Sequence, residues 1–193
     1  MIKMSYSWKI IGLVLVLPLL PFIIFSQQTI DISGHQDCKN ALNINTEKDF
    51  GPTTPPPGPG QVVEFSGNSL DNKLYFEDEH HSVWYKFQVP YTGMLTFDII
   101  PLQTRDDYDF ILYKYEYKYG KFCVYVKDKK IKPIRTNISR NDPSIGSKTG
   151  LSLTSNITFK DAGPGQSYSK AIQVKKNDIY YLVLDNVYEN GKG

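Results

Sequence analysis

From residue 61 onward, side chains of this chain alternate between apolar and polar, which is the two-residue period of a β-strand with one buried face. The alternation is clearest in three segments: 82–89 (SVWYKFQV), 94–100 (MLTFDII) and 107–115 (DYDFILYKY). No segment keeps apolar residues at the 3.6-residue spacing of an amphipathic helix over several turns. The pattern therefore predicts an all-β fold.

Shorter segments complete the predicted set of strands: 61–65, 170–175 and 179–184. The last of these, IYYLVL, is apolar at every position, so we expect it at the centre of a sheet. The short link at 90–93 predicts an antiparallel hairpin between the strands on either side of it. Strands of this kind pack into two layers, so we predict an antiparallel β-sandwich of the jelly-roll type.

The chain divides into three parts. Residues 1–27 have the composition of an export leader, residues 28–60 form an N-terminal arm, and residues 61–193 carry the predicted sandwich. The arm ends in GPTTPPPGPG, residues 51–60, whose prolines and glycines predict a loop or a polyproline spacer. The final NVYENGKG is turn-like and follows a strand, so we expect the sandwich to lack its last strand and a further domain to follow.

Residues 1–27 follow the layout of a secretory signal peptide. Lys3 and Lys9 precede an apolar stretch at 10–25, and Ser26 provides a small residue for cleavage. This stretch is shorter than the ~20 residues of a membrane span and contains prolines, which disfavours the alternative of an uncleaved anchor. Cleavage would remove two of the 22 basic side chains and leave them balanced against the 20 acidic ones. We therefore expect no binding to nucleic acid.

The two cysteines, Cys38 and Cys123, would enter an oxidising compartment after export, where a disulfide can form. A bridge between them would join the N-terminal arm to the sandwich. Two free, buried thiols are the alternative, because a sequence does not show whether two Cβ atoms approach each other.

Three stretches also carry a family resemblance. They are 81–99 with VWY and G-x-L-T-F, 106–115 with D-Y-D-F, and 167–186 with Y-x-L-x-x-D-N. These motifs resemble the PPC-like (pre-peptidase C-terminal-like) and CUB-like β-sandwiches, above all the N-terminal domains of secreted and outer-membrane proteins of Bacteroidetes. Several of those proteins continue into an OmpA-like peptidoglycan-binding domain. The resemblance implies an accessory or adhesion-like module rather than a stand-alone enzyme.

Acidic side chains gather at two predicted strand ends. Asp106, Asp107 and Asp109 form the densest carboxylate cluster, and Asp185 and Asn186 end another strand. If the two ends are adjacent, Asp107, Asp109, Asp185 and Asn186 could supply oxygen ligands to calcium, which the resemblance to CUB-like domains also implies. The alternative, which we favour, is that these residues are turn formers bound to backbone N–H groups. No other cofactor is expected.

Aromatic residues form a second candidate site. Trp84 falls on the polar face of its predicted strand, and YKYEYKYGK places Tyr113, Tyr115 and Tyr117 in alternation with charged residues. Rows of exposed aromatic side chains stack on sugar rings or anchor proteins. These four residues are therefore a candidate binding face for a cell-surface glycan or a protein. Inward-facing tyrosines are the alternative.

Other patterns that could carry chemistry are weak. The run 77–81, EDEHH, contains metal-ligating groups, but adjacent histidines of a strand point to opposite faces, so we interpret the run as solvated charge. The sequence contains no nucleophile elbow, zinc-hydrolase motif or phosphate-binding loop. No pair of carboxylates stands out as a glycosidase pair.

Together these features predict a non-catalytic, exported β-sandwich module of a bacterial surface or OmpA-family-like outer-membrane protein, with a binding or scaffolding role. The alternatives are a carbohydrate-binding or adhesion domain and, third, an accessory domain of a secreted hydrolase.

Overall fold

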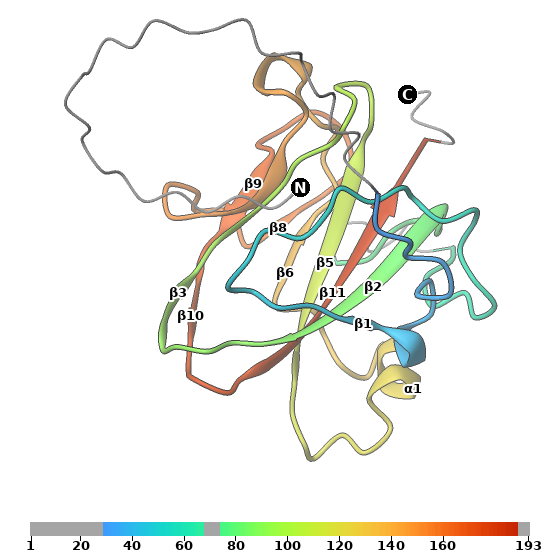
Figure 1. Ribbon diagram of the computed structural model, residues 1–193, viewed down its shortest axis with the longest axis vertical. Coiled ribbons are helices and arrows are strands. Elements are labelled where there is room, and N and C mark those ends of the chain that lie inside the picture. Colours follow the sequence, from blue (N-terminus) through green and yellow to red (C-terminus); the bar gives the residue numbers. More distant parts are fainter. Residues whose placement is uncertain (1–28, 68–73, 189–193) are drawn as a thin grey trace, which may run out of the picture.

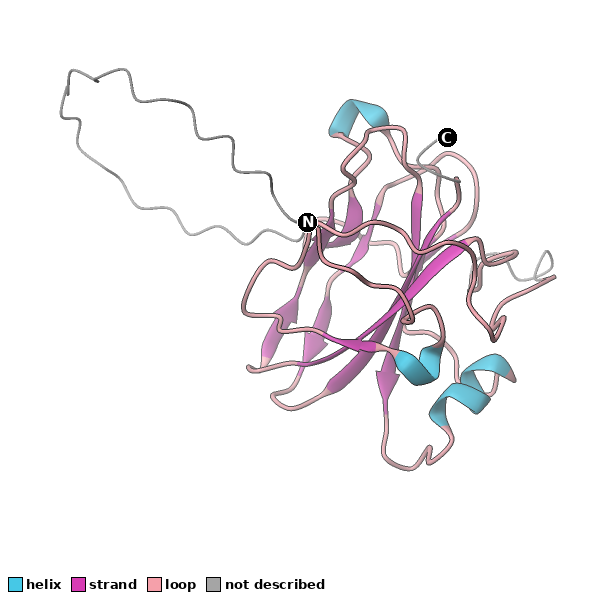
Figure 2. Cartoon of the chain, turned by 45° about the vertical axis from the view of Figure 1, so that its right-hand side comes forward, coloured by secondary structure: helices cyan, strands magenta, loops and turns pink. Residues whose placement is uncertain are grey.

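The computed structural model describes residues 29–67 and 74–188, which form the coloured part of Figure 1. Its strands are β1 (Leu42–Asn43), β2 (His81–Gln88), β3 (Gly93–Leu95), β4 (Phe97–Ile99), β5 (Tyr108–Tyr115), β6 (Arg135–Asn137), β7 (Thr149–Ser152), β8 (Phe159–Lys160), β9 (Tyr168–Lys170), β10 (Ile172–Val174) and β11 (Ile179–Asn186). Three short helices accompany the strands (Figure 2): η1 (Cys38–Asn40) before β1, α1 (Phe122–Lys127) between β5 and β6, and η3 (Pro143–Ile145) between β6 and β7. The predicted all-β class is confirmed. The predicted leader, residues 1–27, lies outside the described residues.

The three longest strands lie side by side in a six-stranded sheet with the order β1-β2-β11-β5-β6-β8 (Figure 1). β11 pairs antiparallel with β2 on one side and with β5 on the other over its whole length. This confirms the central position predicted for 179–184. The short edge pairs, β1 with β2 and β6 with β8, are parallel, so the sheet is mixed.

A second layer contains a two-stranded sheet, β10-β3, and a three-stranded sheet, β4-β7-β9. The predicted hairpin between 82–89 and 94–100 is wrong, because β3 pairs with β10 and not with β2. The physical reason is that both edges of β2 are already paired, one with β1 and the other with β11. The Val89 N–H donates to the Asp178 carbonyl, and the Val89 carbonyl accepts from Asn177. Pro90 then has no N–H to continue a ladder, and the chain crosses to the second layer.

The strand predicted at 61–65 does not form. Backbone N–H groups in this segment bind carboxylates instead of a neighbouring strand. Asp37 Oδ1 accepts from Gln61 and from Val62, each at 2.9 Å, and Glu79 Oε2 accepts from Glu64 at 3.2 Å. The segment 127–166, for which the alternation predicts no strand, contains β6, β7 and β8. These strands are too short to give a readable alternation.

Both faces of the six-stranded sheet are buried. One face packs against the second layer; this first core is built around Val83, Tyr85, Phe87, Phe110, Leu112, Tyr180 and Leu182. The other face is covered by η1, the segments around Phe65 and Phe76, and helix α1; this second core is built around Phe65, Phe76, Trp84, Ile111, Tyr113, Phe122 and Val183. Double coverage explains why β11 is apolar at successive positions.

A disulfide joins two of the segments that cover the second core. Cys38 of η1 bonds to Cys123 of α1, with the Cα atoms 5.7 Å apart. The pairing that the sequence left open is therefore confirmed. A buried disulfide of this kind indicates an oxidising, extracytoplasmic environment. Among the described residues, no helix has the length and apolar character needed to cross a membrane.

Gly150 is required where β7 lies against β4. It is the register partner of Asp98, its φ is 145°, and an added Cβ would collide with the Phe97 carbonyl. We expect Gly150→Ala to lower the free energy of unfolding by roughly 1–3 kcal/mol, because the backbone must shift to remove the collision. Urea denaturation measures this. Gly120→Ala is the control, because a Cβ at Gly120 meets nothing within 4 Å; equal losses in both variants would contradict the prediction.

Candidate functional site

The central strands end in a row of polar side chains on the face of the first core. Asn186 of β11 lies between His81 of β2 and Tyr108 of β5, its register partners on either side. All three residues line a cleft of about 520 Å³. His81 and Tyr108 also border a smaller apolar cavity among first-core residues. The polar row therefore forms the floor of a cleft at the end of the sheet.

Two loops form the walls of this cleft, residues 53–57 of the arm and residues 102–106 before β5. His81 holds the first wall in place. Its Nδ1 atom lies 3.0 Å from the Pro56 carbonyl oxygen and 3.1 Å from the Gly58 nitrogen. Consecutive prolines restrict the backbone of this wall. The segment that the sequence predicted as a loop or spacer is thus a loop that forms part of the site.

Asp106 and Asn186, which line the cleft, are both buried. The Asn186 side chain forms a hydrogen bond with the Tyr108 hydroxyl, whereas Asp106 Oδ1 has no partner among the described residues. Asp106 is 7% exposed and Asn186 is 1% exposed. Burial raises the pKa of Asp106, and this outweighs the opposing effects of a Gln103 backbone hydrogen bond and the Arg105 charge.

Asp185 is the centre of another polar row, on the face of the second core. Its carboxylate accepts from the Ser82 hydroxyl and from the His80 backbone N–H, each at 2.9 Å, and lies 2.8 Å from His80 Nδ1. The hydrogen bond to Asp185 raises the pKa of His80. This group is not a hydrolytic triad, because the Ser82 hydroxyl points to the carboxylate rather than to histidine and Ser82 is fully buried.

Two further buried carboxyl groups lie in the second core. Burial raises the pKa of Glu64 to about 7 and that of Glu79 to about 9, and the charge of Glu64 contributes to the Glu79 value. Glu64 Oε1 accepts from the Cys38 N–H at 3.0 Å. The interpretation of 77–81 as solvated charge is therefore wrong for Glu79, whose carboxyl is recruited into the core to bind the Glu64 backbone. The opposite orientation of His80 and His81 is confirmed.

The four residues considered for calcium do not all lie together. Asp109 and Asp185 are register partners, whereas Asn186 lies on the opposite face of the sheet. Asp107 accepts from the Asn141 N–H at 2.8 Å, as the turn-former alternative predicts. Burial raises the pKa of Asp109 well above its ordinary value, which favours a neutral carboxyl over an anionic ligand. Within residues 29–67 and 74–188, no three metal-ligating side chains form a possible metal site.

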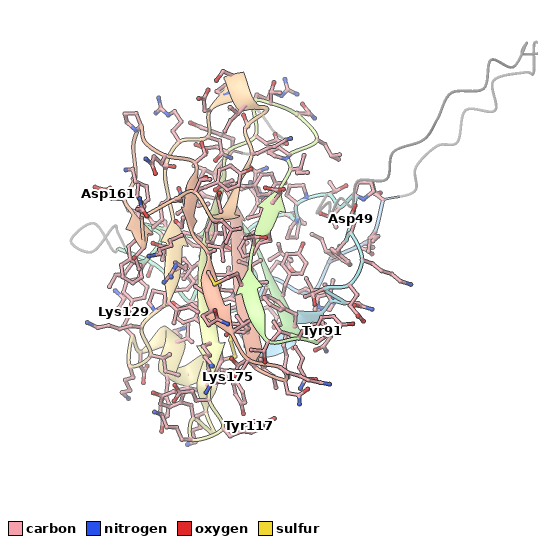
Figure 3. The ribbon with its side chains drawn as sticks, turned by 90° about the vertical axis from the view of Figure 1, so that its left-hand side faces the viewer. Asp49, Tyr91, Tyr117, Lys129, Asp161 and Lys175 are labelled. Atoms are coloured by element: carbon pink, nitrogen blue, oxygen red, sulfur yellow. A yellow bond between two sulfur atoms is a disulfide. The ribbon has the colours of Figure 1, made fainter. Side chains whose placement is uncertain are left out.

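The predicted aromatic face is wrong for two of its four residues. Trp84 and Tyr113 are 0% exposed, and their rings stack in the second core with centroids 6.2 Å apart. Tyr115 is half-buried. Tyr117 is 81% exposed in the loop after β5, and Figure 3 shows it at the lower end of the molecule. Helices η1 and α1 and the segments around Phe65 and Phe76 cover the face that the alternation marks as polar.

Sequence reasoning did not find the cleft. Asp106 and Asn186 were considered only with the acidic strand ends, and His81 only with a charged run. The consecutive prolines within 53–57 are the one signal in the sequence, because a proline-rich segment is semi-rigid and can form the wall of a cleft. The sequence does not reveal the cross-strand neighbours of Asn186, because these depend on which strands pair.

Comparison with known proteins adds no relative: no protein family, no curated protein and no solved structure matches the chain. The resemblance to PPC-like and CUB-like sandwiches therefore stays a prediction.

Proposed function

We propose that this chain is a non-catalytic, extracytoplasmic β-sandwich module that binds a ligand in the cleft between residues 53–57 and 102–106. The observation that carries the proposal is the cleft itself, which two loops wall and which His81, Asp106, Tyr108 and Asn186 line with polar groups. The cleft volume of about 520 Å³ also lies within the ~300–1,000 Å³ of small-molecule sites.

A binding role is favoured over catalysis by the composition of the cleft. Asp106 is the single carboxylate among the described residues that line it. Hydrolysis of a glycosidic bond uses two carboxyl groups on opposite sides of the bond. The serine, histidine and aspartate that do meet, on the other face of the sheet, leave the serine buried and directed away from histidine.

The proposal extends to location. The leader-like residues 1–27 and the resemblance to Bacteroidetes domains support a protein that is secreted or held at the outer membrane or cell surface. A following domain of the same polypeptide, such as the OmpA-like domain of the resembled proteins, would anchor the module. The cleft would then remain available to a ligand outside the cell.

Leu102→Arg tests the site. Leu102 is 64% exposed and lines the cleft, so a charged side chain there should block it without disturbing the core. In a fragment screen followed by two-dimensional NMR of the disulfide-bonded protein, we expect shift changes to concentrate on cleft residues and to disappear in this variant. Leu153→Arg, at a position 68% exposed and outside the cleft, should keep them.

The proposal fails if the same fragments shift other parts of the molecule instead. The open hollow of about 700 Å³ near Tyr91 and Met94 is the competing location, and Figure 3 shows Tyr91 at the edge of the molecule. A screen without any binder would equally count against a ligand-binding role.

A further inference from the structure

The charges of this chain balance overall but not locally. The segment 114–132, which runs from the end of β5 to just past α1, contains seven lysines and two acidic residues, a local excess of five positive charges. One of the lysines is half-buried and the other six are exposed: Lys118, Lys121, Lys127, Lys129, Lys130 and Lys132. Their exposed side chains, with the tyrosines and the valine between them, are called the basic patch below.

The acidic residues of the segment do not neutralise this patch. Glu116 and Asp128 each form an ion pair with one neighbouring lysine of the segment, at 2.6 Å and 2.8 Å. Lys121, Lys127 and Lys132 form no ion pair within residues 29–67 and 74–188. Their charges are therefore available to an anionic partner.

Contacts between aromatic rings and lysines show that the basic patch is continuous in space. The rings of Tyr119, in the loop before α1, and Tyr125, on α1, meet edge to face with centroids 6.3 Å apart. Lys118 Nζ lies 5.0 Å from the centre of the Tyr119 ring, and Lys130 Nζ lies 5.5 Å from that of Tyr125. Lysines from before and after the helix thus gather around one pair of tyrosines.

Two exposed side chains give the basic patch an apolar component. Tyr117 is 81% exposed and Val124 is 52% exposed. Figure 3 shows Tyr117 at the lower end of the molecule, and Figure 1 shows α1 at the same end of the sheet. No residue of 114–132 lines the cleft or the hollow near Tyr91. A protruding loop and helix suit a flat partner better than a small molecule.

This combination of side chains matches an anionic membrane surface. Lysines interact with the headgroups of anionic lipids while their alkyl chains reach toward the interface. Tyrosine and aliphatic side chains enter the boundary between headgroups and acyl chains. A single-stranded nucleic acid, by contrast, binds along a positively charged groove, whereas the basic patch protrudes.

The basic patch and the cleft lie at opposite ends of β5. Tyr108, the first residue of this strand, lines the cleft, and the ring of Tyr115, the last residue, lies 5.5 Å from that of Phe122 on α1. Eight residues of a strand at ~3.3 Å each span about 25 Å. A protein held by the basic patch would therefore keep its cleft away from the surface that holds it.

We propose that the basic patch binds the surface of a membrane that contains anionic phospholipids, with Lys121 and Lys127 at the headgroups and Tyr117 and Val124 in the interface. This interaction is independent of the ligand of the cleft. It gives the module a second site, which orients it on the membrane.

The test is co-sedimentation of the disulfide-bonded protein, recovered after export, with lipid vesicles. We expect binding to vesicles of phosphatidylcholine mixed with phosphatidylglycerol, weaker binding at high salt, and little binding to phosphatidylcholine alone. The double variant Lys121→Gln/Lys127→Gln should bind the mixed vesicles roughly 25-fold more weakly, since each lysine near an anionic surface contributes about fivefold. Lys148→Gln/Lys170→Gln, at two exposed positions outside the basic patch, is the matched control and should bind like the wild type.

Tyr117→Ser separates a membrane from a soluble polyanion as the partner. Loss of the ring should weaken binding to the mixed vesicles about threefold or more, whereas any binding to dextran sulfate should stay unchanged. Leu153→Ser, at a position 68% exposed and outside the basic patch, is the control for this variant.

Equal binding to both kinds of vesicle, or undiminished binding of Lys121→Gln/Lys127→Gln, would overturn the proposal. Binding to dextran sulfate without binding to vesicles would overturn the membrane as partner, and so would failure to bind either. Fragment binding in the cleft is measured on the same variants. Fragments that still bind there while vesicles fail would refute the membrane site alone, and the converse would refute the cleft alone. Urea denaturation checks that each variant is as stable as the wild type.

Discussion

The protein is expected to lose stability steadily as the pH rises from 5 to 9. The cause is the two buried carboxyl groups of the second core, Glu79 and Glu64, with pKa values of about 9 and about 7. In the unfolded chain both would titrate near 4.5. Since the folded state binds protons that the unfolded state has released, their contribution is fully present below pH 4.5. It is lost as the pH passes through 7 for Glu64 and 9 for Glu79.

His80 acts in the same direction. Its pKa is raised by Asp185, so the stability that its charged form contributes is present below its unfolded value of 6.5 and is lost at higher pH. One unit of pKa shift corresponds to about 1.4 kcal/mol. The two glutamates alone therefore give a total loss on the order of several kcal/mol, a large part of the ~5–15 kcal/mol of a typical domain.

The matched variants are Glu79→Gln and Glu77→Gln. Glutamine keeps the shape of Glu79 but cannot ionise, so urea denaturation at pH 5, 7 and 9 should show a much flatter pH dependence in this variant. Glu77 is exposed in the same segment, and its substitution should leave the dependence unchanged. A wild-type stability that stays level or increases toward pH 9 would show that these carboxyls are not held neutral in the core.

The long strands could be predicted from the sequence because their alternation is complete. The segment 82–89 corresponds to β2 (His81–Gln88), and 107–115 to β5 (Tyr108–Tyr115). Their partners could not be predicted, because alternation identifies the buried face of a strand and not its neighbour. The short helix α1 was also missed, since six residues are too few to show a helical period.

The candidate site was harder to predict for a related reason. The alternation places Trp84 and Tyr113 on an exposed face because it marks only one buried face, whereas η1, α1 and the segments around Phe65 and Phe76 bury the other face as well. The sequence identifies Asp106, Asp107 and Asp109 as a dense cluster of carboxyl groups, but the role of each depends on how deeply it is buried. Asp109 is buried on the central strand β5, whereas Asp106 lines the cleft. Burial is a property of the packed layers, which no local pattern of residues contains.

Removing the disulfide is the second change with a large expected effect. The bond between Cys38 and Cys123 closes a loop with a sequence separation of 85 residues, which corresponds to about 4 kcal/mol in the loop-entropy description. The double variant Cys38→Ala/Cys123→Ala, or treatment of the wild type with a reductant, should lower the free energy of unfolding by about this amount. Alanine is chosen because Cys38 is buried and a serine hydroxyl there would need a partner.

The loss should extend to the cleft, because the disulfide and the proline wall belong to the same arm. Cys38 and Asp37 bind the segment that follows the wall, through Glu64 and through the N–H groups of Gln61 and Val62. If the arm loosens, residues 53–57 lose their fixed position above Asn186. Fragment binding should therefore weaken more than in Leu182→Ala, a variant of the first core. Urea denaturation of both variants shows whether their losses of stability are comparable. A reductant should have no effect on the double variant. Unchanged stability after reduction of the wild type would show that the covalent link is dispensable for holding the arm.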